Sequence, residues 1–255
     1  MTEDRPTREE PQYVILEGVV GSTAYNLATP TSDRDRLGVF LEPTISFLSL
    51  DGVPEKRRSW VGPKAAGDRA LHEVGKYCDK LLGGNPTYTE LLWLPGRLYE
   101  VVTDLGLQLI GLRSAFLSAK AVEDSYLGYA VGQFSRLEGR KKKAGEGEQV
   151  GFSSDLRKQT EKHARHMLRL LVQGFQLWET GQLTVSLTDM EAAECRAFGQ
   201  EVAELASKNK PIAIADEKLA EYRAKFAGTR TALPERPDRE GVDAWLKAVR
   251  LAALR

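Results

Sequence analysis

YVILEGVVGS at residues 13–22, followed after ten residues by DRDRLGVFL at 33–41, is the stretch that decides the fold of this chain. The first run is apolar, rich in β-branched residues and of strand length, which predicts a buried strand that ends at Gly21-Ser22. The second run predicts another strand, closed by Pro43. Between them, Thr23–Leu27 predict a short helical turn. The order strand, glycine-serine turn, strand is the basis of the interpretation that follows.

Two carboxylates stand one residue apart at the start of the second predicted strand. Strand side chains alternate between faces, so Asp33 and Asp35 point the same way, with Cα atoms roughly 7 Å apart at ~3.4 Å per residue. A divalent cation relieves their repulsion, and hard oxygen ligands suit Mg²⁺, which also borrows substrate phosphates. Gly21 lets the backbone approach a phosphate, and Ser22 offers a hydroxyl and an N–H. The alternative is a turn whose carboxylates are simply solvated.

Composition and charge exclude several classes of protein. The 255 residues include 36 Lys and Arg and 36 Asp and Glu, so no overall field draws the chain to nucleic acid or to a membrane surface. The 2 cysteines, Cys78 and Cys195, form no metal or redox motif, which favours a reducing compartment. The first ten residues are polar, and no apolar run approaches the ~18 residues of a membrane span. We expect a cytoplasmic protein without a membrane partner.

Beyond residue 73 the pattern changes to helical periodicity. Polar segments at 54–67 and 140–149 predict loops, and 69–71 predict a short third strand. Apolar residues at helical spacing predict helices over 74–82, 85–92, 105–116, 122–137, 155–180, 189–207, 216–227 and 242–254. We therefore expect an α+β protein: a small mixed-sheet unit over 11–100, followed by a helical bundle over 101–255 that packs on it.

This part of the chain resembles the signature of the nucleotidyltransferase superfamily that includes DNA polymerase beta. That signature is an apolar residue, Gly-Ser, a gap of this length and Asp-x-Asp. Here the signature reads Val20-Gly21-Ser22 and Asp33-Arg34-Asp35, with Arg34 where many members carry an apolar residue. Further matches narrow the resemblance to the RlaP-type branch, which is named for an association with RNA repair. These matches are Gly21–Tyr25, Ser32–Asp35 with Gly38-Val39, Asn85-Pro86 with Glu90, and Lys162–His166 with Arg169, and the resemblance spans about Val14 to Pro237.

The resemblance implies a fold, a reaction and its cofactor. It implies a nucleotidyltransferase catalytic core at 11–100 and transfer of a nucleoside monophosphate from an NTP to an acceptor hydroxyl, with release of pyrophosphate. Mg²⁺, or Mn²⁺ in its place, is the implied metal, with Asp33 and Asp35 as ligands and Gly21-Ser22 gripping the triphosphate. An RNA 3′ end is the favoured acceptor, with a protein or a small molecule as alternatives. A non-catalytic nucleotide- or RNA-binding relative is the second hypothesis, and other protein partners are not indicated.

A third acidic residue on a neighbouring strand usually completes the metal site in this superfamily and acts as general base. Asp68 fits this role, because it follows a polar loop and precedes the short strand at 69–71. Glu73 is the competitor, although it points to the opposite strand face from Asp68 and begins the next helix. Glu90 lies in the Asn-Pro helix, where holding that helix against the active-site strands is the simpler role. The alternative for Asp68 is a solvated loop end.

The long helix predicted at 155–180 carries two stripes. Residues three and four apart share a helix face, so Lys162, His166 and Arg169 form a polar stripe. The family resemblance favours a cationic wall for the triphosphate, where these side chains stabilise charge on the leaving pyrophosphate. A solvated face is the alternative, and zinc binding by His163 and His166 lacks a third ligand. The opposite stripe predicts core and consists of Ala164, Leu168, Leu171, Phe175 and Trp178.

Four further features have modest predicted roles. Tyr25 either stacks on a base or packs behind the glycine-serine turn, and His72 is expected in the core or behind the site. The basic runs Arg140–Lys143 and Lys56–Arg58 are either solvated loops or contacts to a nucleic-acid backbone, which would weaken steeply with salt.

Overall fold

The computed structural model describes residues 9–30, 32–63, 68–145, 154–208, 210 and 212–254, without the side chains of 140–145 and 154. The chain divides into two compact units. The first, here the sheet unit, comprises the chain up to Gly83, Thr87–Leu117 and the segment from Pro237 onward. The second, the helical unit, comprises Gly84–Pro86 and Ser118–Arg236. The division into domains at residue 100 remains a prediction.

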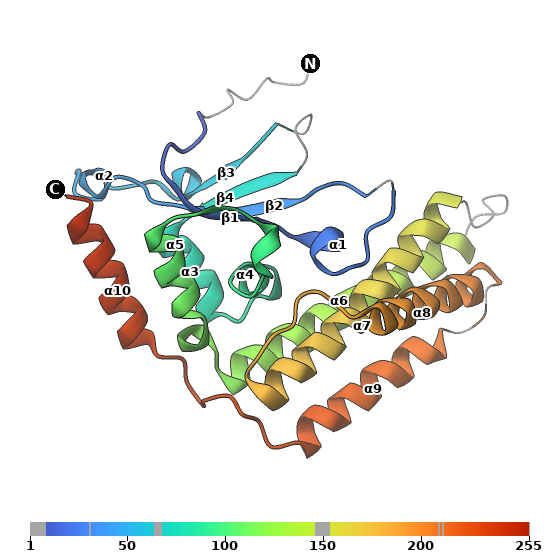
Figure 1. The fold of residues 1–255 in the computed structure, drawn as a ribbon. Helices are drawn as coiled ribbons and strands as arrows, with labels where there is room; N and C mark the ends of the chain where they lie inside the picture. The colour runs from blue at the N-terminus through green and yellow to red at the C-terminus, as the bar shows by residue number, and fades with distance from the viewer. Residues whose placement is uncertain are drawn as a thin grey trace. The chain divides into compact units, whose positions relative to one another are not determined.

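A five-stranded mixed sheet forms the centre of the sheet unit (Figure 1). β1 pairs antiparallel with β2 and β5, β2 pairs parallel with β4, and β3 pairs antiparallel with β4. This confirms the predicted α+β class with a small mixed sheet. In spatial order the strands are β3 (Ser59–Val61), β4 (Arg69–Glu73), β2 (Arg36–Phe40), β1 (Val14–Val19) and β5 (Tyr99–Val102).

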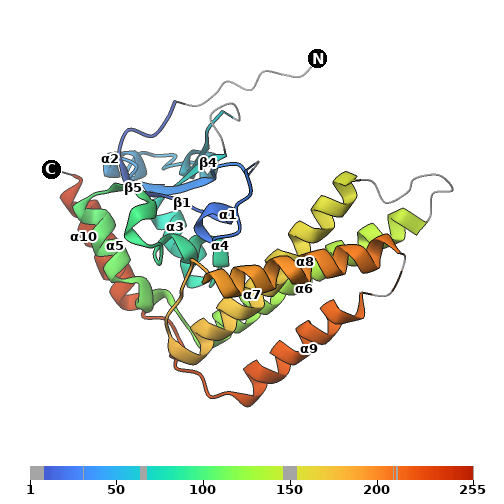
Figure 2. The same ribbon diagram turned by 45° about the vertical axis from the view of Figure 1, so that its right-hand side comes forward.

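Helices α3, α4 and α5 lie on one side of this sheet, as both ribbon views show (Figures 1 and 2). Gly18 of β1 permits this packing, because a Cβ there would lie 3.3 Å from the Leu91 side chain and closer still to that of Leu94. The helices of this unit are α1 (Gly21–Ala24), α2 (Thr44–Phe47), α3 (Val74–Leu82), α4 (Pro86–Leu91), α5 (Asp104–Gly111) and α10 (Arg239–Ala252). Within the described part of this unit, three 3₁₀ turns join the helices: η1 (Glu55–Arg58), η3 (Gly96–Leu98) and η4 (Arg113–Phe116).

The helical unit consists of long helices around α7. α7 (Ser154–Thr180) packs against α6 (Ala119–Gly145), α8 (Asp189–Ser207) and α9 (Ala213–Gly228). Of the apolar stripe predicted on α7, Ala164, Leu168, Leu171 and Trp178 are buried in the core. Phe175 is half-buried, with its ring against those of Tyr222 and Phe226 in α9. No helix in the described residues is long and apolar enough to cross a bilayer.

Two predicted loops are partly regular structure. The segment predicted as a loop at 140–149 is wrong in its first half, because the backbone of α6 remains helical through Gly145. Lys, Arg and Ala are strong helix formers, and they extend the helix although the segment lacks an apolar stripe. Within 54–67 the chain forms η1 and β3, since Trp60 buries its ring against Phe40 and Leu71.

We predict that Gly174→Ala destabilises the protein by about 1–3 kcal/mol, because an added Cβ at this α7 position would lie 2.6 Å from the Cβ of buried Tyr126 in α6. Gly128→Ala is the matched control on α6, where nothing lies within 4 Å of the added atom. The control should stabilise by about 0.5–1 kcal/mol through helix propensity. Urea unfolding monitored by circular dichroism measures both changes, and equal effects would contradict the described α6–α7 packing.

Candidate active site

The glycine-serine turn lies directly against the second aspartate of the Asp-x-Asp pair. Gly21 has φ of 70°, a left-handed conformation that favours glycine. A Cβ on Gly21 would lie 3.3 Å from Asp35 Cγ and closer still to Oδ2. The Val20 N–H donates to the Asp35 carbonyl at 2.9 Å, which fixes the two segments together. The fold therefore brings the turn and the Asp35 carboxylate, fourteen positions apart in sequence, to one place.

Asp68 stands at the same end of the sheet as Asp35. β2 and β4 are parallel with Arg36 opposite Arg69, and the Arg36 N–H donates to the Asp68 carbonyl at 2.8 Å. Asp35 and Asp68 therefore directly precede the first residues of two adjacent parallel strands. Asp33 and Asp68 are exposed, and Asp35 is half-buried. These carboxylates are accessible to a ligand from solvent.

A bidentate ion pair anchors the residue after Asp68. The Arg69 guanidinium donates to both carboxylate oxygens of buried Glu17, at 2.5 and 2.6 Å. Glu17 belongs to β1, so this pair reaches across β2 at Gly38 and ties β4 to β1. Its hydrogen bonds to carboxylates raise the pKa of Arg69 far above its ordinary value. The start of β4, and with it the backbone of Asp68, is thereby held in place.

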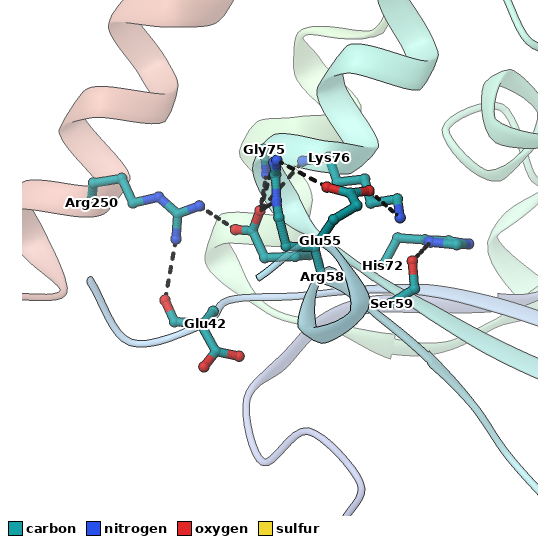
Figure 3. Close-up of polar contacts among 9 residues, drawn as sticks. Glu42, Glu55, Arg58, Ser59, His72, Gly75, Lys76 and Arg250 are labelled. Atoms are coloured by element: carbon teal, nitrogen blue, oxygen red, sulfur yellow. Dashed lines mark hydrogen bonds and ion pairs between the residues drawn. The ribbon is translucent and has the colours of Figure 1, made fainter. Parts of the chain in front are cut away.

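The competing third carboxylate, Glu73, lies at the other end of β4 and is fully buried. Its Oε2 caps α3 by accepting the N–H groups of Gly75 and Lys76 at 3.0 and 3.3 Å. Arg58 and Arg250 pair with the same carboxylate, in the cluster drawn in Figure 3. Glu73 is thus a capping residue with its charge already compensated, and it is not brought together with Asp35. Of the two candidates, the geometry favours Asp68.

The arginines that alternate with the aspartates are paired elsewhere. Arg34 Nη2 and Arg36 Nε bind the two carboxylate oxygens of Glu100 at 2.6 and 2.7 Å. The strand predicted at 33–41 is shorter in the structure, because β2 covers Arg36–Phe40 and both aspartates precede it. The sequence interpretation missed Glu100, which lies on β5, a strand that was not predicted. No pattern in the sequence identifies Glu100, because it and Arg34 are 66 positions apart.

Tyr25 and Glu90 form a supporting layer behind the turn. Tyr25 is buried directly after α1, and its hydroxyl donates to the buried carboxylate of Glu90 in α4. Tyr25 therefore packs behind the glycine-serine turn, which was one of its two predicted positions. Through this hydrogen bond Glu90 holds α4 against the segment that carries Gly21-Ser22.

The carboxylates of this segment suit a hard cation that water and a bound substrate also help to hold. Among the described residues, no three His, Cys, Asp or Glu side chains gather into a cluster that could hold a metal ion by themselves. Mg²⁺, however, is commonly bound by one or two carboxylates while water and substrate phosphates supply its other ligands. The Asp33–Asp35 segment beside a glycine turn offers that chemistry.

His72, the residue before Glu73 in β4, is a neutral hydrogen-bonding group. Its Nδ1 is 2.9 Å from the Ser59 hydroxyl and its Nε2 is 3.1 Å from the Tyr88 hydroxyl. Burial, followed by the charges of Lys76 and Lys80, lowers the pKa of His72 to about 4. His72 is therefore uncharged at neutral pH, and its expected role stays a prediction.

The predicted stripe on α7 runs from solvent into the core of the helical unit. Lys162 is exposed, and Arg169 is buried, donating from Nη1 to Gln173 Oε1 at 2.7 Å. Burial is the main cause that lowers the pKa of half-buried His166 to about 3, and the Arg169 charge adds to it. His163 shares a 2.6 Å hydrogen bond with Gln133 of α6. A wholly solvated stripe is therefore wrong for Arg169, while the phosphate-binding role of the stripe stays a prediction.

The two basic runs have different outcomes. In η1, Arg57 pairs with Glu42 and Arg58 with Glu73, so two of its cations are engaged within the protein. The side chains of Arg140–Lys143 lie outside the described residues.

Residues 4–236 match the family model described as RlaP, RNA repair pathway DNA polymerase beta family. The chain belongs to this family. RlaP is a polymerase-beta-like nucleotidyltransferase family linked to RNA repair, which agrees with the turn and the carboxylates of the sheet unit. No curated protein matches the chain.

We predict that Gly21→Ala costs more stability than a change of backbone conformation alone. Gly52→Ala is the control, because Gly52 also has a left-handed φ, of 59°, but its added Cβ would meet only one atom, at 4.0 Å. Both variants should lose about 1–2 kcal/mol from the left-handed backbone, and Gly21→Ala should lose more through collision with Asp35. Urea unfolding measures the difference, and equal losses would contradict the Gly21–Asp35 approach.

We predict that His72 makes the protein less stable in mild acid. The folded-state pKa of about 4 is below the ordinary value of 6.5, so the unfolded chain binds the proton first. The stability associated with neutral His72 is complete above about pH 6.5 and is lost as the pH falls toward 4. His72→Gln should therefore show a shallower loss of unfolding free energy between pH 7.5 and 4.5 than the wild type. Identical pH slopes would contradict the assignment.

Proposed function

We propose that this protein transfers a nucleoside monophosphate from an NTP to an acceptor hydroxyl and releases pyrophosphate, in a reaction that depends on Mg²⁺ or Mn²⁺. The observation that carries the proposal is the contact of the Gly21 backbone with the Asp35 carboxylate, with Asp68 at the adjacent strand end. A triphosphate needs backbone donors, and the metal that accompanies it needs carboxylate oxygens. This segment of the sheet unit supplies both.

Each residue has a role set by its chemistry. Asp33 and Asp35, with Asp68, would hold the divalent cation, which neutralises phosphate charge and orients the reacting oxygens when bound. Gly21 and Ser22 present backbone N–H groups, and Ser22 a hydroxyl, to the triphosphate. Because Gly21 lacks a side chain, the phosphates can approach the backbone beside Asp35.

The reaction is an in-line displacement at the α-phosphorus. The acceptor oxygen forms a bond to this atom while the bond to the bridging oxygen of the β-phosphate breaks, and pyrophosphate leaves with that electron pair. Asp68 accepts the proton from the acceptor hydroxyl, a role suited to an exposed carboxylate that an incoming substrate can reach.

Lys162, His166 and Arg169 of the helical unit are proposed to stabilise the charge of the triphosphate. Lys162 is an exposed cation, and its ammonium group has the charge that binds phosphate. His166, with a pKa of about 3, is neutral at physiological pH and so contributes a hydrogen bond instead of a charge. Arg169 is the buried cation of this set, so its contribution is a fixed positive charge behind the other two.

An RNA 3′ end is the proposed acceptor, on the strength of the family's link to RNA repair. Transfer to a protein hydroxyl or to a small molecule is the alternative within the same chemistry. Incubation with each α-labelled NTP, Mg²⁺ and total cellular RNA or protein distinguishes these acceptors by what becomes labelled.

We predict that Asp33→Ala and Asp35→Ala each reduce NMP transfer by about 10³-fold, because several kcal/mol of charge stabilisation at the transition state are lost. The fold should survive, since Asp33 is exposed and Asp35 is not fully buried. Asp51→Ala is the matched control, an exposed carboxylate of the same unit in a turn, and should keep wild-type activity.

Label transfer per unit time by the purified variants measures this effect. Normal transfer by the Asp33→Ala, Asp35→Ala double variant would contradict the assignment. If the wild type forms no product and no NTP with Mg²⁺ raises its melting temperature, the chain is a non-catalytic relative.

A further inference from the structure

The C-terminal helix α10 belongs to the sheet unit although it lies beyond the matched family region. The family match ends at residue 236, and α10 begins at Arg239. The Asp238 side chain caps the helix by accepting the Gly241 N–H at 2.9 Å. Val242 and Val249 are buried, and α10 packs against α3 and η4. The chain thus returns to the sheet with an element whose role the family does not give.

One side chain of α10, Arg250, enters the polar cluster of Figure 3. Its Nη2 pairs with Glu73 Oε1, and its Nη1 donates to the Glu42 backbone carbonyl at 3.1 Å. Its guanidinium lies 4.1 Å from the centroid of the Phe47 ring. The helix backbone is tied as well, because the Thr44 hydroxyl donates to the Arg250 carbonyl at 2.8 Å. A guanidinium group is planar and carries several N–H donors, so it can hold two acceptors in a fixed relative position.

The two acceptors of Arg250 lie at the ends of neighbouring strands. Glu73 is the last residue of β4 and is opposite Phe40, the last residue of β2, while Glu42 follows β2 by two residues. Arg250 therefore bridges the carboxyl ends of β2 and β4. The amino ends of the same two parallel strands carry Asp35 and Asp68.

Burial makes this bridge firm. Glu73 is fully buried, and the carboxylate is shared between Arg250 on Oε1 and Arg58 with two backbone N–H groups on Oε2. A buried carboxylate that loses one of its charge partners is costly, so removal of Arg250 leaves the charge of Glu73 less well compensated. η1 also links these two strand ends, because Arg58 pairs with Glu73 and Arg57 with the Glu42 carboxylate, whereas Arg250 does so with one side chain from a distant helix.

We infer that Arg250 is a positioning residue, which fixes β2 against β4 at their carboxyl ends and so keeps Asp35 and Asp68 in register at the opposite ends. The inference rests on the proposed function. A displacement of about 1 Å at reacting groups costs on the order of 10²-fold in rate. The NTP is gripped mainly at Gly21-Ser22, so a register error should act on turnover more than on nucleotide binding.

The kinetic test uses the full chain with Arg250→Ala and Arg250→Lys. Arg250→Ala should lower kcat at least about 10-fold while KM for the NTP stays within about 2-fold. Arg250→Lys should restore activity only in part, because one ammonium cannot hold both acceptors in a fixed geometry. Lys247→Ala, which removes an exposed cation paired with Asp243 on the same helix, should leave kcat unchanged.

A second control separates positioning from stability. Val242→Ala removes buried methyl groups from α10 and should lower the melting temperature without the kcat effect. If Val242→Ala and Arg250→Ala reduce kcat equally at equal loss of stability, Arg250 is only structural and the inference is overturned. If Arg250→Ala does not fold, the kcat of Arg250→Lys is compared with that of Lys247→Ala, and equal values would overturn the inference.

Hydrogen exchange tests the same inference without any assay of activity. In Arg250→Ala, peptides covering residues 33–41 and 68–73 should exchange faster than in Lys247→Ala, because the amides between β2 and β4 lose protection. If the wild type transfers no nucleotide but this exchange pattern appears, the proposed function fails, while the role of Arg250 in holding β2 against β4 is supported. Unchanged exchange together with unchanged kcat would overturn the role of Arg250.

Discussion

The close approach of the Gly21 backbone to the Asp35 carboxylate is the constraint on which the rest of the site depends. It requires a residue without a side chain in a left-handed conformation, a first strand that ends at Val19, and a second strand whose preceding carbonyl accepts the Val20 N–H. Once these conditions are met, the glycine-serine turn and a carboxylate share one place. The parallel pairing of β2 with β4 then adds Asp68 from the neighbouring strand end.

The same two strands carry opposite chemistry at their two ends. At the amino ends the carboxylates are exposed or half-buried, and the neighbouring arginines are drawn to Glu100 and Glu17. At the carboxyl ends, buried Glu73 is compensated by Arg58, Arg250 and helix N–H groups. Glu73 is compensated within the protein and supports the fold, whereas Asp68 is exposed to solvent. This contrast in burial and partners distinguishes Asp68 from Glu73 although both flank one short strand.

Features set by local sequence could be predicted, and features set by distant contacts could not. The apolar runs gave β1 and β2, and helical periodicity gave α3, α7 and α8, because each pattern buries its own apolar residues. The three-residue β3 and four-residue β5 were missed, since such short strands at the sheet edges have too few residues to show a period. The pairing of Glu100 with Arg34 and of Arg250 with Glu73 joins residues far apart in sequence, so it appears only when the strands are assembled.

The most direct measurement of the central claim is paramagnetic line broadening of backbone amides by Mn²⁺ bound together with an NTP. If the nucleotide and metal sit between the glycine-serine turn and the first carboxylates, the amides of Gly21, Ser22, Asp35 and Asp68 should broaden first. Those of Glu73 and Arg250, at the far ends of the same strands, should stay sharp at equal metal occupancy. Broadening centred on Glu73, or none at Gly21 when nucleotide and Mn²⁺ are both saturating, would contradict the account.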